Sequence, residues 1–328
     1  MSYQRVLIVR RATRLQELIA RFNTKPQARF YIESAGGDFA DYDAEDAAYH
    51  RALDAVEHGL RAVAKVHVID RSYLPNYQFA DDELVVAVGQ DGLVANTAKY
   101  ALERPIVGVN PDPSRYDGVL LPFDAQTSIA AVRATIAGDA PIQRVSMAET
   151  QLKDGQRLLA FNDFFIGVRS HVSARYRIAV KGAAARQEEQ SSSGVLVSTG
   201  AGSTGWLSSV FNMAAGVGAF TGGRVNVPSP LNWSARELRY IVREPFVSRT
   251  THADIVAGVL HEHESLEIES HMPVNGVIFS DGIEQDFLQF NSGAIAQVGL
   301  ASVSAQLVTA RKQRPPSDRK AQRRRPGG

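Results

Sequence analysis

Short apolar runs that alternate with helical patterns fill the first 140 residues, and this alternation is the feature that most constrains the fold. The apolar runs, rich in β-branched residues, cover 5–9, 65–69, 83–88 and 105–109. The helical patterns cover about 13–22, 43–63 and 93–102. Strands that are apolar along their length and separated by helices are typical of a parallel sheet covered on both faces. The sequence therefore predicts a doubly wound α/β domain at residues 1–140.

Beyond about Gln143 the pattern changes to strands separated by turns. The expected strands cover 144–152, 157–168, 174–180, 194–200, 236–244, 264–270, 277–283 and 294–300. One helix is expected in this half, from Ser203 to about Met213, whereas 182–193 and 216–230 have the composition of loops. These features predict a β-rich, sandwich-like domain at residues 141–310.

Charge is concentrated at the end of the chain. The tail, 311–328, holds eight Lys or Arg against one Asp, so the rest of the chain is acidic although the net charge is only +1. Because the tail has almost no apolar residues, we expect it to be disordered, either as a solvated extension or as a weak contact for a polyanion. An acidic body argues against a dedicated nucleic-acid-binding protein.

Missing residue types and segments exclude several classes of protein. The chain has no Cys, which excludes disulfides, thiol nucleophiles and Cys-based zinc sites. No apolar run reaches the roughly 20 residues that span a bilayer, and the N-terminus lacks the pattern of a signal peptide. His261, His263 and His271 fit an exposed strand face better than a metal site. We expect a soluble, cytoplasmic protein with no metal held by protein ligands alone.

An acid stands between two glycines where the third apolar run ends. The stretch Gly89-Gln90-Asp91-Gly92 lies at the carboxyl end of a predicted strand, where open α/β sheets bind ligands. The glycines allow a tight turn and a close approach to a ligand, and the following helix offers free N–H groups to an anion. A carboxylate beside a phosphate can accept a proton from an attacking hydroxyl or hold Mg²⁺. The alternative is that Asp91 only caps the helix.

Two further stretches place polar residues at the end of an apolar strand or within one. In GVLVSTGAGSTGWLSS, 194–209, an apolar strand leads through Ser, Thr and Gly into a helix. This composition suits a hydroxyl-rich ligand, or simply a capped helix start. In AFNDFFIGV, Asn162 and Asp163 interrupt an otherwise apolar strand. Buried polar residues need partners, which a ligand, a β-bulge or a structural hydrogen-bond network would supply.

Taken together, these stretches resemble the motifs of the NAD kinase family. The family's GGDG motif corresponds to Gly89–Gly92, and its Asn-Glu or Asn-Asp pair corresponds to Asn162 and Asp163. Its T-x-T-G-S-T-A-Y run corresponds to Thr199–Trp206, and FSDG at 279–282 resembles its FDG turn. The resemblance spans about 80–300. It implies an α/β domain and a β-rich domain with a cleft between them, usually in a homodimer or homotetramer.

The resemblance also implies a reaction and a role for each motif. Phosphoryl transfer from ATP, with Mg²⁺, to NAD would give NADP, and Asp91 would activate the 2′-hydroxyl of the adenosine ribose. The residues implied to contact the nucleotide or NAD are Gly89, Gln90, Gly92, Asn162, Asp163, Ser203, Thr204 and Trp206. The glycine turn would approach phosphates, the Asn-Asp pair would hold hydroxyl groups of NAD, and the third motif would bind the substrate from the other domain.

Several positions depart from the family pattern, and of these Trp206 replaces a Tyr but keeps an aromatic face for stacking. Gln90 replaces a glycine and Leu93 replaces a Thr at the phosphate-donor end. Ser193 stands where many members carry an acid that contacts the nicotinamide end, although the mitochondrial-type branch also has Ser-Ser-Gly there. Two alternatives therefore stay open: a kinase for another hydroxyl compound, such as a lipid, and a regulatory nucleotide-binding protein without activity. The sequence also leaves open ATP or polyphosphate as the donor and NAD or NADH as the acceptor.

Overall fold

The computed structural model of the chain describes residues 3–182 and 185–310. The basic tail at 311–328 lies outside the described residues, so the disorder predicted for it stays a prediction. Among the described helices, none has the length and apolar character that crossing a bilayer would require.

The larger sheet begins with parallel strands and continues as an antiparallel one. Its strands, in spatial order, are β2 (Lys65–Asp70), β1 (Arg5–Arg10), β3 (Glu83–Val88), β4 (Pro105–Val109), β16 (Ile295–Val308), β13 (Ser265–Ser270), β8 (Ala174–Lys181) and β9 (Arg186–Ser192). Beside β16 lie β5 (Ile142–Leu152) and then β6 (Arg157–Ala160). Pairing is parallel from β2 to β4 and at the β4–β16 contact, and antiparallel beyond it.

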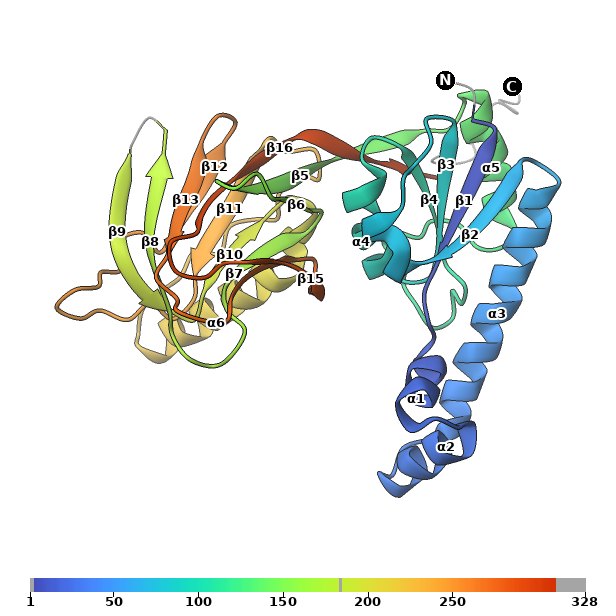
Figure 1. Cartoon of the computed structure of the whole chain (residues 1–328), viewed down its shortest axis with the longest axis horizontal. Helices are drawn as coiled ribbons and strands as arrows, with labels where there is room; N and C mark the ends of the chain where they lie inside the picture. Colours follow the sequence, from blue (N-terminus) through green and yellow to red (C-terminus); the bar gives the residue numbers. More distant parts are fainter. Residues whose placement is uncertain (1–2, 183–184, 311–328) are drawn as a thin grey trace, which may run out of the picture.

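Helices cover both faces of the parallel part. On the parallel strands, α3 and α5 pack on one face and α4 on the other. The helices of the described residues are α1 (Arg14–Phe22), α2 (Lys25–Ser34), α3 (Phe39–Arg61), η1 (Arg71–Asn76), α4 (Asp91–Ala101), α5 (Thr127–Ala137), η2 (Ala201–Thr204) and α6 (Trp206–Phe220). Successive β1 residues point to opposite faces: Ile8 packs with α3 and α5, and Leu7 packs with α4. The doubly wound α/β fold predicted from the apolar runs is therefore confirmed. Helices α1 and α2 project beside one end of α3 (Figure 1).

A second sheet packs on the antiparallel part of the first. Its strands, all antiparallel, are β12 (Ala257–His261), β11 (Glu237–Val242), β10 (Val195–Ser198), β7 (Asp163–Val168), β14 (Gly276–Ser280) and β15 (Ile283–Gln289). Phe164 and Ile166 of β7 share one buried cluster with Tyr176 and Ile178 of β8. Two sheets that face each other across such a core form a sandwich, so the predicted β-rich half is confirmed.

One long strand belongs to both halves of the molecule. β16 pairs with β13 through Val298 and Leu266, and its last residues pair with β4 through Leu307 and Ile106. Figure 1 shows β16 and β5 running side by side from one half to the other. The halves are therefore joined by a hydrogen-bonded ribbon, with α4 facing the second half.

Some elements differ from the sequence predictions. The segment 182–193, read as a loop, contains the strand β9, whose side chains are charged or polar because it lies at a sheet edge. The helix expected to end near Met213 continues to Phe220, so the loop prediction for 216–230 is wrong at its start. Helices α2 and α5 and strands β12 and β15 were not expected.

Candidate functional site

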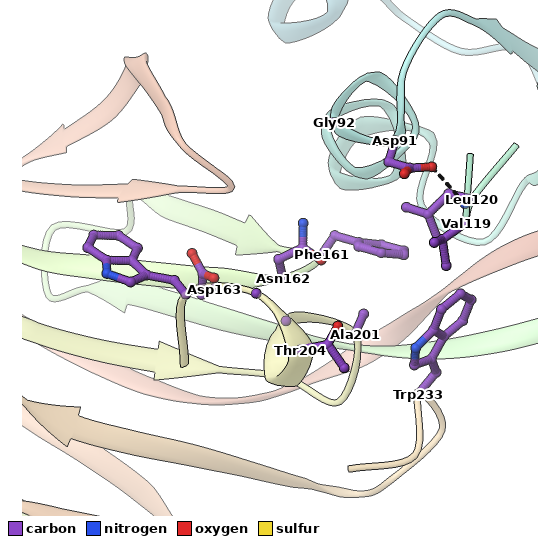
Figure 2. A pocket seen from close by; sticks show the side chains of 13 residues that line it. Asp91, Gly92, Val119, Leu120, Phe161, Asn162, Asp163, Ala201, Thr204 and Trp233 are labelled. Carbon is purple, nitrogen blue, oxygen red and sulfur yellow. Dashed lines mark hydrogen bonds between the residues drawn. The ribbon is translucent and has the colours of Figure 1, made fainter. Parts of the chain in front are cut away.

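A pocket of about 340 Å³ lies where α4 faces the second half. Its walls come from the start of α4, the segment that joins β6 to β7 and the η2 turn that leads into α6, and they are completed by the loop after β4 and by Trp233. The lining residues are Asp91, Gly92, Val119, Leu120, Phe161, Asn162, Asp163, Ala201, Gly202, Thr204, Gly205, Trp206 and Trp233. Figure 2 shows Asp91 across the pocket from Asn162 and Thr204. Three sequence motifs that lie far apart in the chain therefore meet at one cavity.

Asp91 is the first residue of α4, and its carboxylate is oriented by another loop. The backbone N–H of Leu120 donates a hydrogen bond of 2.7 Å to Oδ1 of Asp91 (Figure 2). The N-cap is Gln90, and its side chain makes no capping hydrogen bond. Asp91 therefore sits in the first helical turn, where the positive end of the helix dipole favours negative charge, and does not serve as the cap itself.

The two glycines of the turn have different surroundings. A Cβ on Gly89 would lie 2.9 Å from Cδ2 of Leu93, and the Gly89 N–H donates to Val109 O at 3.1 Å. A Cβ on Gly92 would meet no atom within 4 Å. Gly92 lines the pocket, whereas Gly89 and Gln90 do not. The open side of this turn is therefore at Gly92.

Asn162 lies in the turn between β6 and β7, and Asp163 is the first residue of β7. The side chain of Asp163 is buried, and no described residue donates a hydrogen bond to its carboxylate. Burial, and to a smaller extent the neighbouring Asp281 carboxylate, raises the pKa of Asp163 to about 7. A buried carboxyl without a protein donor, on the wall of a cavity, is suited to receive hydroxyl groups of a ligand.

The two hydroxyl residues of the η2 turn have different surroundings: one is bonded inside the protein, and the other lines the pocket. Ser203 is buried: its Oγ donates to Gly200 O at 2.7 Å and accepts the N–H of Leu231 at 3.1 Å. Thr204 is exposed and lines the pocket. A Cβ on Gly200 would lie 2.0 Å from Asn232 O, so the turn is packed too tightly for a side chain there.

Trp206 forms an aromatic wall at the start of α6. Its ring lies 5.8 Å from that of Phe165, with an angle of 13° between the ring planes, and the Arg243 guanidinium lies 5.4 Å from its centroid. The indole is therefore held by stacking, and Trp206 is one of the residues that line the pocket.

Sequence reasoning missed the residues that complete the pocket. Val119 and Leu120 lie in the loop between β4 and α5, and Trp233 follows a glycine-rich segment. The sequence around these residues contains no local signal for the pocket, because they reach it only through the packing of loops. Asp281, in the FSDG turn that the sequence analysis noted, lies behind Asn162 and Asp163 and accepts their backbone N–H groups.

The described residues contain no group of three or more His, Cys, Asp or Glu side chains that could hold a metal ion. Mg²⁺ in nucleotide sites needs fewer protein ligands, because it is bound through one or two carboxylates and the phosphates of the nucleotide. The Asp91 carboxylate, with one oxygen bonded to Leu120, fits that limited role.

The fold is similar to that of solved kinases. Neither a protein-family model nor a curated protein sequence matches the chain. The crystal structure of yeast NADH kinase complexed with NADH aligns with a TM-score of 0.60 at 15% identity, covering 94% of this chain and 84% of that chain. An NAD kinase from Archaeoglobus fulgidus in complex with ATP aligns with a TM-score of 0.57 at 15% identity, covering 94% of each chain. The chain therefore has the fold of these NAD and NADH kinases, with an α/β half and a β-rich half.

Proposed function

We propose that the protein is an NAD kinase, which transfers the γ-phosphoryl group of ATP to the 2′-hydroxyl of the adenosine ribose of NAD and forms NADP. One observation carries the proposal: Asp91, at the start of α4, shares a cavity with the Asn162–Asp163 turn and with Thr204 of the other half. The two structural neighbours were solved in complex with NADH and with ATP, which supports the same choice of substrates.

Asp91 is proposed as the general base. Its Oδ1 accepts the Leu120 N–H, which holds the carboxylate in one orientation over the cavity. As the ribose oxygen bonds to the γ-phosphorus, the bond from that phosphorus to the β,γ-bridging oxygen breaks, the hydroxyl proton passes to Asp91, and ADP leaves. Positioning and charge compensation supply most of the catalysis in such transfers, so a fixed carboxylate is the contribution expected of this chain.

The other half would hold the acceptor. Asn162 and Asp163 would bind ribose hydroxyl groups, since the Asp163 carboxyl has no donor among the described residues. Thr204 and the indole of Trp206 would contact the rest of the nucleoside. The acceptor hydroxyl would then lie between this group and Asp91.

The donor would approach from the start of α4. The open space beside Gly92 and the N–H groups of the first helical turn suit a phosphate group. Mg²⁺ would arrive with ATP and be held by its phosphates, which leaves the free Asp91 oxygen for the acceptor proton. Bound there, it would neutralise the charge of the phosphate oxygens.

The test is an assay of the purified protein with ATP, Mg²⁺ and NAD, in which NADP is measured by a coupled dehydrogenase. We expect NADP to form, and we expect Asp91→Asn to lower kcat by about 10²- to 10⁴-fold, as removal of a general base does. Circular dichroism of the variant would confirm that it is folded. Asp154→Asn, in a surface turn between β5 and β6, is the matched control.

Two outcomes would contradict the proposal. Binding of NAD without turnover would indicate the regulatory protein, and phosphorylation of a lipid or other hydroxyl compound alone would indicate the other kinase. Replacing ATP with polyphosphate in the same assay identifies the donor, and replacing NAD with NADH identifies the preferred acceptor.

A further inference from the structure

A buried lysine joins α4 to the hairpin formed by β14 and β15. The side chain of Lys99 is only 1% exposed, and its Nζ lies 3.4 Å from Oδ2 of Asp286. Nζ also donates a hydrogen bond of 2.9 Å to Oγ of Ser280, and the hydroxyl of Tyr100 donates to the Asp286 carboxylate. An ammonium group is costly to bury unless its partners are well placed, so this contact tolerates little displacement of α4 from the hairpin.

The residue after Ser280 holds the substrate-facing turn. Asp281 occupies the tight β14–β15 turn with a φ of 55°. Its Oδ1 accepts the N–H of Asn162 at 2.6 Å and that of Asp163 at 3.3 Å, and its Oδ2 accepts the N–H of Phe161 at 3.0 Å. Its own N–H donates to Asp163 O at 3.0 Å. One carboxylate thus binds the backbone of three consecutive residues on the pocket wall.

Lys99 and Asp281 also interact through charge. Burial raises the pKa of the Asp281 carboxyl, while the Lys99 ammonium and the three backbone N–H groups act in the opposite direction. Only the ionised carboxylate can accept three N–H groups with both oxygens and no competing proton. The lysine therefore favours the form of Asp281 that holds the turn.

Helix α4 carries Asp91 at one end and Lys99 eight residues later. At 1.5 Å per residue the two are separated by about 12 Å of continuous helix. We propose that Lys99 and Asp281 are positioning residues, which fix the Asn162–Asp163 turn relative to Asp91 by linking α4, the β14–β15 hairpin and that turn in one chain of contacts. This inference rests on the proposed function for its catalytic consequence, but the contacts can be tested without any activity.

Hydrogen exchange of the backbone tests the contacts directly. The N–H groups of Phe161, Asn162 and Asp163 are bonded to the Asp281 carboxylate, so they should exchange slowly in the wild type. In Asp281→Asn the side-chain NH₂ would face backbone donors. We expect exchange in 161–163 to accelerate at least tenfold in this variant and in Lys99→Met. Unchanged exchange in both folded variants would overturn the inference, whether or not the wild type forms NADP.

Kinetics test the consequence for the reaction. Misplacement of reacting groups by about 1 Å can lower a rate by about 100-fold, so we expect kcat for NADP formation to fall 10- to 100-fold in Lys99→Met with the KM for ATP unchanged. Lys99→Arg should recover part of kcat. Equal kcat in wild type and Lys99→Met would overturn the inference, whereas an inactive wild type would overturn the proposed function and leave the exchange test in force.

Matched controls separate positioning from general loss of stability. Lys181→Met removes another ion-paired lysine, bonded to Glu267 at 3.2 Å in the sandwich. Asp154→Asn alters another carboxylate that accepts a backbone N–H in a tight turn. Neither should change exchange in 161–163. If Lys99→Met does not fold, Ser280→Ala removes only the hydroxyl partner of Nζ and should still accelerate exchange, and unchanged exchange in it would count against the proposal.

Discussion

Asp91 and Leu120 are joined by a hydrogen bond of 2.7 Å from the backbone N–H of Leu120 to Oδ1 of the acid. The bond connects the start of α4 to the loop after β4, so the direction of the carboxylate depends on both. A general base needs its free oxygen at a definite distance from the hydroxyl proton. We therefore expect kcat to be sensitive to the length of the side chain at position 91 as well as to its charge.

Asp91→Glu tests this sensitivity. The added methylene would move the carboxylate past the position that both the Leu120 N–H and the ribose hydroxyl require. We expect kcat to fall at least tenfold while the dissociation constant for NAD stays within about twofold, because the other half holds the acceptor. Steady-state kinetics and calorimetry measure the two quantities. A Glu variant as active as the wild type would rule out a fixed base.

Ser203→Ala and Thr204→Ala should affect different properties: the first variant should lower stability, and the second should weaken NAD binding. Ser203 uses its hydroxyl inside the protein, so its loss leaves the Leu231 N–H without its acceptor, removes one of the donors to Gly200 O, and should lower the free energy of unfolding by about 1–3 kcal/mol. Thr204 is exposed in the pocket, so its variant should weaken NAD binding at nearly unchanged stability. Urea denaturation and calorimetry would show the two effects. Weaker binding in folded Ser203→Ala alone would reverse the assignment.

The sequence was most informative where burial determines residue type. The bounds of β3 and β4 agree with the apolar runs at 83–88 and 105–109, because strands covered on both faces are apolar along their length. β9 escaped notice because Arg186–Ser192 lies at an edge and has no apolar pattern. In α6, Gly216 and Gly218 suggested a loop, yet both are accommodated within the helix.

The motifs of the candidate site could be found from the sequence, but their surroundings could not. Asp91, Asn162 and Thr204 stand in recognisable stretches at strand ends, and the structure brings them to one cavity. The bond from Leu120 and the contact between Lys99 and Ser280 depend on packing between segments up to 181 residues apart. Neither Leu120 nor Lys99 differs in type from ordinary core or helix residues, so the sequence contains no local signal for them.

Gly92→Ala tests whether the space beside Gly92 serves the approach of a phosphate and is not needed for the stability of the turn. No atom lies within 4 Å of the added Cβ, and alanine favours a helix more than glycine by at most about 1 kcal/mol. The free energy of unfolding should therefore stay equal or rise. The methyl group would occupy the space beside the helix start, and we expect the KM for ATP to rise several-fold with NAD binding unchanged.

Gly89→Ala is the matched control for that variant. Its Cβ would approach the flexible end of the Leu93 side chain at 2.9 Å, away from the pocket lining. We expect a modest loss of stability and little change in the KM for ATP. If Gly89→Ala raised the KM for ATP and Gly92→Ala did not, the donor would have to approach the other side of the turn.

The Asp163 carboxyl predicts a dependence of stability on pH. Its pKa is raised from 3.8 to about 7, so the folded protein binds this proton more tightly than the unfolded chain. The contribution of this group to the free energy of unfolding is therefore largest below about pH 4, falls as the pH rises to about 7, and is constant above that. Asp163→Asn should remove this part of the pH dependence in urea denaturation curves recorded between pH 5 and 8.

The same carboxyl predicts that NAD binds more tightly as the pH rises through 7. An ionised carboxylate accepts hydrogen bonds from ribose hydroxyls more strongly than the protonated acid, and the bound hydroxyls would replace the donors that the buried group lacks. Calorimetry with NAD between pH 6 and 8 should show the dissociation constant falling with an apparent pKa near 7. In Asp163→Asn the affinity should be lower and independent of pH in this range. A variant that keeps the wild-type pH profile would show that another group titrates, and Asp163 would then have no part in holding the substrate.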